Sequence, residues 1–164
     1  MADIPVEKKF AILTEITRAQ HFAWHDAVKE MCPDVDVAAV TDKMWEITGH
    51  QTAAAYIKRL DRDKPLAAQV AASIVWISQC MGEAAELKVT AGKDEAFVVH
   101  DDCPWVHWHR RLGLLHEDLP GCDVWFQTTV SDINAALGTN LKVETQESLP
   151  KGQPTCTRRF WVEE

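Results

Sequence analysis

The sequence predicts an α+β fold in which three helices precede an antiparallel sheet of four strands. In the first 82 residues, apolar side chains recur at helical spacing. Beyond Gly82 the pattern changes to short β-prone runs separated by turn residues. A chain of 164 residues is of ordinary length for one domain, and it contains no internal repeat or low-complexity linker. We therefore expect one domain over residues 1–164, in which a helical half (1–82) and an α+β half (83–164) share a core.

Three helices are predicted for the first half. Apolar residues at helical spacing run from Val6 to Met31, and Pro33 ends that run. A second helix is predicted after Asp36, a suitable N-cap, and it ends in the charged stretch 61–64. A third helix has Pro65 in its first turn and stops at Gly82.

The second half is predicted to have the order ββααββ. A hairpin-length loop at 91–94 separates two β-prone runs, and a proline opens each of the two following helices. The turn at 149–154 separates the last two strands. The expected elements are strands 87–90 and 96–100, helices from Cys103-Pro104 to about Leu112 and from Pro120-Gly121-Cys122 to Gly138, and strands 141–146 and 156–162.

The charge and composition of the sequence argue against nucleic acid and membranes as partners. A formal charge of -8 and the lack of a basic cluster argue against nucleic acid. No run reaches about 18 apolar residues, and the first residues are charged where a signal peptide would be apolar, so we expect no membrane association and a cytoplasmic location. Five cysteines, an odd number, favour reduced thiols over a disulfide framework.

Three cysteines are candidates for chemistry. Cys103 precedes Pro104, so its thiol is expected at a helix N-cap, where free N–H groups and the helix dipole stabilise a thiolate. Cys122 follows Pro120-Gly121 in a similar arrangement, and Cys156 lies on the last strand. The alternative is that they are small buried packing residues. No C-x-x-C pair is present, so the usual spacing of a structural zinc site is missing.

Histidines near these thiols are candidate bases or metal ligands. His107 lies four residues after Cys103, which on a helix places both on one face, while His109 must point away from His107. Both histidines could instead be surface residues. His21 and His25, also four apart, form a weaker candidate metal pair because a third ligand would have to come from elsewhere.

The C-terminal half resembles the L-2-amino-thiazoline-4-carboxylic acid hydrolase family and, more distantly, vinyl-reductase-like small-molecule-binding domains. The resemblance rests on HDDCP at 100–104, GCD at 121–123 and SLPKGQPTCTRRF at 148–160, and it covers about residues 83–162. The family's cysteines map onto Cys103, Cys122 and Cys156. Gln153 departs from the acidic residue that the family's turn usually carries.

The resemblance implies a hydrolase that opens a C–N bond in a small cyclic amidine-like ring, a thiazoline carboxylate in the family. Catalytic roles then fall to Cys103, His107, Cys122 and Cys156, with Cys103 as nucleophile and His107 moving protons. Alternatively, one divalent metal ion held by these residues would activate water.

A different class of function is a non-catalytic domain that binds a small apolar or aromatic ligand. Seven tryptophans make such a pocket plausible, although core packing also explains them. Trp105, Trp108 and Trp125, together with His109, are the residues expected to contact substrate or ligand. The sequence does not fix whether the chain is a homo-oligomer or an accessory subunit docked on a larger enzyme.

Overall fold

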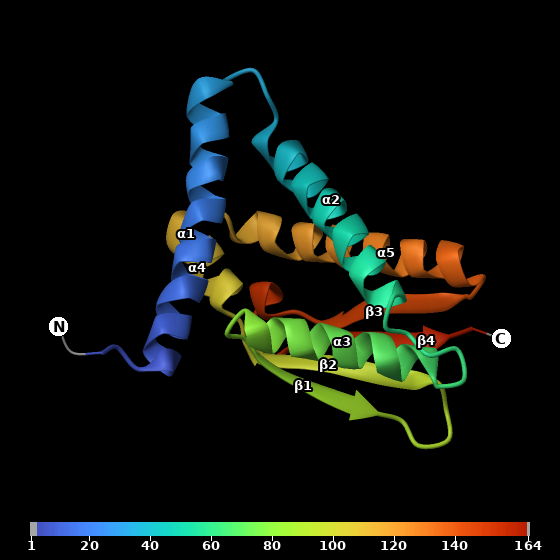
Figure 1. The fold of residues 1–164 in the computed structure, drawn as a ribbon. Coiled ribbons are helices and arrows are strands. Elements are labelled where there is room, and N and C mark those ends of the chain that lie inside the picture. Colours follow the sequence, from blue (N-terminus) through green and yellow to red (C-terminus); the bar gives the residue numbers. More distant parts are fainter. Residues whose placement is uncertain (1–2, 164) are drawn as a thin grey trace.

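The computed structural model describes residues 3–163 and has helices packed on one face of a four-stranded sheet (Figure 1). The predicted α+β class and the change from helices to strands near Gly82 are confirmed. In chain order the elements are α1 (Val6–Met31), α2 (Val37–Ile57), α3 (Leu66–Cys80), β1 (Ala84–Val89), β2 (Glu95–Asp102), α4 (Pro104–Leu112), α5 (Leu115–Leu137), β3 (Leu141–Glu147), a 3-10 turn (Leu149–Lys151) and β4 (Cys156–Val162).

Local sequence signals explain most helix ends. The Asp36 carboxylate accepts a hydrogen bond from the Ala39 N–H at 3.3 Å and caps α2, as expected. Pro65 precedes α3 but has no polar side chain to cap it. Asp94, from the β1–β2 turn, fills that role by accepting from the Leu66 and Ala67 N–H groups at 2.8 Å each. This cap fixes one end of α3 to the hairpin.

The start of α5 differs from the prediction. The helix begins at Leu115, and Pro120 lies inside it. Glu117 and Asp118 in the first turn suit the positive end of the helix dipole. Pro120 follows them inside the helix, where it removes one backbone N–H donor. Cys122 therefore lies within α5, and the prediction that its thiol sits at a helix start was wrong.

The sheet has the strand order β1-β2-β4-β3 and is antiparallel throughout. The register pairs Val98 with Arg158 and His100 with Cys156 across β2 and β4. One face of the sheet packs against α3 and α5, and α2 crosses α5 and packs against it (Figure 1). Residues of both halves, Tyr56 and Phe160 among them, belong to one hydrophobic core.

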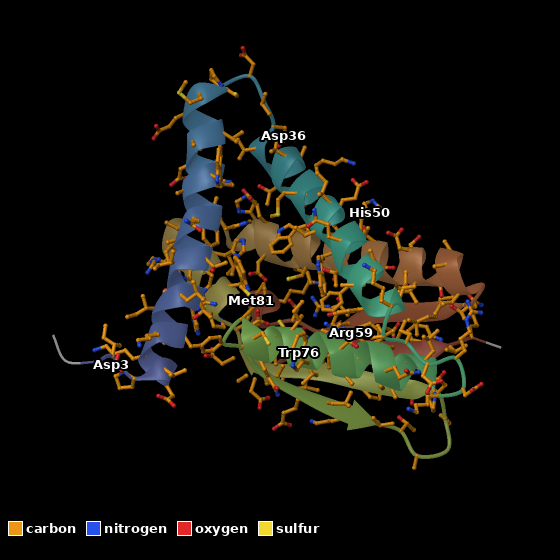
Figure 2. The ribbon with its side chains drawn as sticks, in the orientation of Figure 1. Asp3, Asp36, His50, Arg59, Trp76 and Met81 are labelled. Carbon is orange, nitrogen blue, oxygen red and sulfur yellow. The ribbon has the colours of Figure 1, made fainter. Side chains whose placement is uncertain are left out.

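Helix α1 lies at the side of this assembly. Buried Arg18 donates to the Met81 carbonyl at 2.8 Å, which ties α1 to the end of α3, and to the Thr14 hydroxyl within α1 at 3.2 Å. Figure 2 shows Met81 at the end of α3 near α1, and Arg59 close to Trp76, where the guanidinium carbon lies 5.4 Å from the ring centroid. Across residues 3–163, no helix has both the length and the apolar character needed to cross a membrane.

Two glycines allow α2 and α5 to approach each other closely. A Cβ added at Gly49 would lie 2.9 Å from Thr128 Cβ and 3.1 Å from the Trp125 carbonyl. One added at Gly121 would lie 2.6 Å from Trp45 Cδ1. Contacts this short require the neighbours to move, and overpacking of this kind destabilises a core.

We expect Gly49→Ala to destabilise the protein by about 1–3 kcal/mol, measured by urea unfolding, because the methyl group would force α2 and α5 apart. The control is Gln51→Ala at an exposed position of the same helix, which should change stability by less than about 0.5 kcal/mol. If Gly49→Ala instead stabilises the protein by about 1 kcal/mol, as helix propensity alone would give, the close approach is not a constraint.

Candidate functional site

A cavity of about 260 Å³ lies between the helices and the sheet. Residues from α2, α3, α4, α5, β2 and β4 line it, so both halves of the chain contribute. Its wall is mostly apolar. The aromatic and aliphatic part of that wall is formed by Trp45, Ile74, Ile77, Trp105, Trp125 and Phe126.

The three candidate cysteines all line this cavity. Cys103 is the N-cap residue of α4, Cys122 lies in α5, and Cys156 begins β4 opposite His100. All three are half-buried free thiols, whereas Cys32 and Cys80 are exposed. The fold thus brings together residues that are far apart in the sequence.

The environment of these thiols keeps them protonated. Burial, with Glu83 adding to it, raises the pKa of Cys103 to about 12. Burial and Asp118 raise the pKa of Cys122 well above its ordinary value. Burial also raises the pKa of Cys156, although the Leu149 N–H, which donates to its sulfur at 3.3 Å, acts in the opposite direction. A thiol with a raised pKa is a poor nucleophile near neutral pH.

His107 does not face the cavity. Cys103 has an extended backbone, with φ -137° and ψ 112°, so the helical spacing that would place both side chains on one face does not apply. The His107 ring is exposed at the surface and pairs with Asp102. The expected placement of His107 beside the Cys103 thiol was therefore wrong.

Trp108 also lies outside the cavity, contrary to expectation. Its ring stacks on Phe22 of α1, with centroids 5.4 Å apart, and its indole N–H donates to Glu15 at 3.2 Å. The Arg111 guanidinium covers the ring at 3.7 Å. Trp108 thus joins α4 to α1, while Trp105 and Trp125 line the cavity as expected.

His109 and Asp118 form a buried pair at the cavity wall. His109 Nδ1 lies 2.7 Å from Asp118 Oδ2 and 3.0 Å from the Trp105 carbonyl oxygen. A carbonyl can only accept, so Nδ1 carries a proton. His109 was expected to contact a ligand, and the structure places it in the wall of the cavity.

A second polar group links β2 to the start of β1. Glu83 Oε2 lies 3.2 Å from His100 Nε2, and the same nitrogen is 3.0 Å from the Ser78 hydroxyl. Glu83 Oε1 accepts the Trp105 indole N–H at 3.0 Å, which fixes this ring at the cavity. These polar side chains satisfy one another at the edge of an apolar space.

His21 packs against aromatic rings, and His25 faces a carboxylate of α5. The His21 ring contacts Phe22, Trp45 and Trp105, with centroid distances of 4.9, 5.5 and 5.4 Å. Burial lowers the pKa of His21 to about 4. His25 Nε2 lies 3.3 Å from Glu117 Oε2. Among residues 3–163, no group of three or more His, Cys, Asp or Glu side chains is arranged to hold a metal ion.

The cavity residues that sequence reasoning missed include Trp45, Asp118 and Arg158. One signal was available for Arg158. It lies between Cys156 and Phe160 in a period-two pattern, so a strand with an inward apolar face also turns Arg158 inward. No comparable local signal marks Trp45 or Asp118, because their positions depend on how α2 and α5 pack.

No family model and no curated protein matches the sequence. Among solved structures, the chain is similar to a trafficking protein particle complex subunit 3 from Naegleria fowleri, crystallised with covalently bound palmitic acid. That match has a TM-score of 0.54 and 15% identity, and it covers 94% of this chain and 97% of the other. A mutant H-NOX protein from S. oneidensis in the Fe(II) ligation state matches with a TM-score of 0.46 and 9% identity, over 87% of this chain and 72% of the other. The first likeness establishes a shared fold.

We expect iodoacetamide to label Cys32 and Cys80 quickly at pH 7.5 and the three cavity thiols at least about tenfold more slowly, because only the thiolate reacts. With its pKa raised to about 12, Cys103 should react faster with each pH step up to that value. Peptide mass spectrometry resolves the five sites. Rapid labelling of Cys103 at neutral pH would contradict this assignment and indicate a poised nucleophile.

Proposed function

We propose that this chain is a binding domain for a small apolar or aromatic ligand, which occupies the cavity between the helices and the sheet. The observation that carries the proposal is the cavity itself, with three indoles and several aliphatic side chains in its wall. Ligand sites are typically concave and mostly apolar, with a few fixed polar groups that orient the ligand.

The polar groups in the wall suit binding. Glu83 fixes the Trp105 indole, and the His109 Nδ1–H is directed to the Trp105 carbonyl. Because these contacts hold the side chains in place without a ligand, little conformational entropy is lost when one binds. This preorganisation supports a receptor or carrier role for the domain.

The trafficking complex subunit that shares this fold holds covalently bound palmitic acid. An apolar ligand bound to a protein of the same fold supports the proposal that the present cavity is a ligand site. Covalent attachment is not part of the proposal, because the raised pKa values of Cys103, Cys122 and Cys156 disfavour thiol attack.

The ring-opening hydrolase implied by the sequence resemblance is the second candidate. Its support is that His109, with the Asp118 carboxylate 2.7 Å from its Nδ1, lies in the wall of the cavity that contains the thiols, because a histidine near a thiol can act as its base. In this version His109 takes the role first expected of His107. The version of the hydrolase with Cys103 as nucleophile requires a reactive thiolate, so the alkylation experiment discriminates between that version and the binding domain.

We expect the purified protein to bind neutral naphthalene-2-carboxamide, measured by isothermal titration calorimetry, and Ile77→Trp to weaken that binding at least about tenfold. Ile77 lines the cavity, so the larger ring would fill space that the ligand needs. Gln79→Trp is the matched control, since it adds the same ring at an exposed position of α3. Equal loss in both variants, or no binding by the wild type, would overturn the proposal.

A further inference from the structure

Arg158 places a permanent positive charge in the wall of the cavity. Its side chain is only 3% exposed, and its guanidinium carbon lies 5.0 Å from the centroid of the Phe126 ring. Arg159, the next residue, is turned to the other face of the sheet and pairs with Glu95 and Glu144. The two neighbouring arginines therefore have different surroundings.

The Arg158 guanidinium has too few partners for a buried charge. Its Nε and Nη1 atoms are buried without a hydrogen-bond partner. The paired carboxylate is Asp123, whose Oδ1 lies 3.6 Å from Nη2, and this oxygen already accepts from the Thr145 hydroxyl at 2.6 Å. Arg158 also contacts the Cys156 thiol, but sulfur is a weak acceptor. Buried charges are normally paired, so these N–H groups are available to an anionic ligand.

The other charged groups at the cavity leave Arg158 available. Asp118 Oδ2 lies 2.7 Å from His109 Nδ1, although it too is buried without a hydrogen-bond partner, and Glu83 Oε2 lies 3.2 Å from His100 Nε2. Neither carboxylate forms an ion pair with Arg158. A ligand with a single negative charge would offer an acceptor to these N–H groups, whereas a doubly charged phosphate would bring a second charge into an apolar space without a cation.

We propose that the ligand of this cavity is a small aromatic or aliphatic carboxylate, whose acid group binds the free N–H groups of Arg158 while its apolar part contacts the tryptophans. This inference rests on the proposed binding function and names the class of ligand. Hydrogen bonds between a guanidinium and a carboxylate are short and strong, and they gain strength in a surrounding of low polarity.

The test compares two ligands of nearly equal shape, naphthalene-2-carboxylate and naphthalene-2-carboxamide, by calorimetry on the whole chain. We expect the wild type to bind the carboxylate at least about tenfold more tightly, the usual gain from a charge-assisted hydrogen bond. Equal affinity for both would overturn the inference while the binding function stands. If neither ligand binds, both proposals fail.

Substitutions at Arg158 and Arg159 test whether Arg158 causes the preference for the carboxylate over the carboxamide. Arg158→Met should abolish the preference for the carboxylate over the carboxamide, since the charged hydrogen bond is lost while the side-chain volume changes little. Arg159→Met, the matched control, should keep the preference. Loss of the preference in Arg159→Met, or its survival in Arg158→Met, would overturn the assignment.

A stability measurement separates ligand binding from a structural role. Without ligand, Arg158→Met should unfold at or above the wild-type temperature, because an apolar side chain replaces a poorly paired buried charge. Arg158→Lys keeps the charge and should keep part of the carboxylate preference, which provides a second variant if the first does not fold. A marked fall in unfolding temperature for both variants would show that the guanidinium has a structural partner and would overturn the inference.

Discussion

The close packing of α2 against α5 is the constraint on which the cavity depends. Gly49 lets α2 approach the Trp125 turn of α5, and Gly121 leaves room for the Trp45 ring. Thr129 adds a hydrogen bond to the Gly49 carbonyl at 3.4 Å. Because backbone packing holds these helices above the sheet, the space between them does not require a ligand for its shape. A preformed cavity of this kind is the usual setting of a small-molecule site.

The buried charged groups determine which ligand this cavity can bind and whether its thiols can react. Desolvation of an ion is costly, so an interior that contains Arg158 together with Asp118 and His109 needs compensating partners. A ligand carboxylate would supply one of them. It would also raise the pKa of the nearby thiols further, since a negative charge disfavours a thiolate. A site that binds an anion therefore also keeps its cysteines protonated and unreactive. Both properties argue against a thiolate nucleophile in this cavity.

Much of the fold could be predicted from the sequence because its signals are local. The bounds of α1 and β4 follow from periodicity and from neighbouring proline and turn residues. The predicted start of α5 was wrong because Pro120 was interpreted as the first helical position, although the helix tolerates it after its first turn. The position of His107 was wrong because helical spacing holds only when both residues are helical, and Cys103 is extended. The role of Arg158 needed the packing of the sheet, which no local pattern contains.

The most direct test of a ligand site inside the fold is a methyl NMR titration of isoleucine-labelled protein with naphthalene-2-carboxylate. Ile74 and Ile77 line the cavity, whereas Ile12 and Ile16 are exposed on α1. A ring current acts only over short distances, so binding in the cavity should shift the Ile74 and Ile77 methyl signals and leave those of Ile12 and Ile16 unchanged. Shifts confined to Ile12 and Ile16 would place the ligand on the surface of α1 and contradict the account.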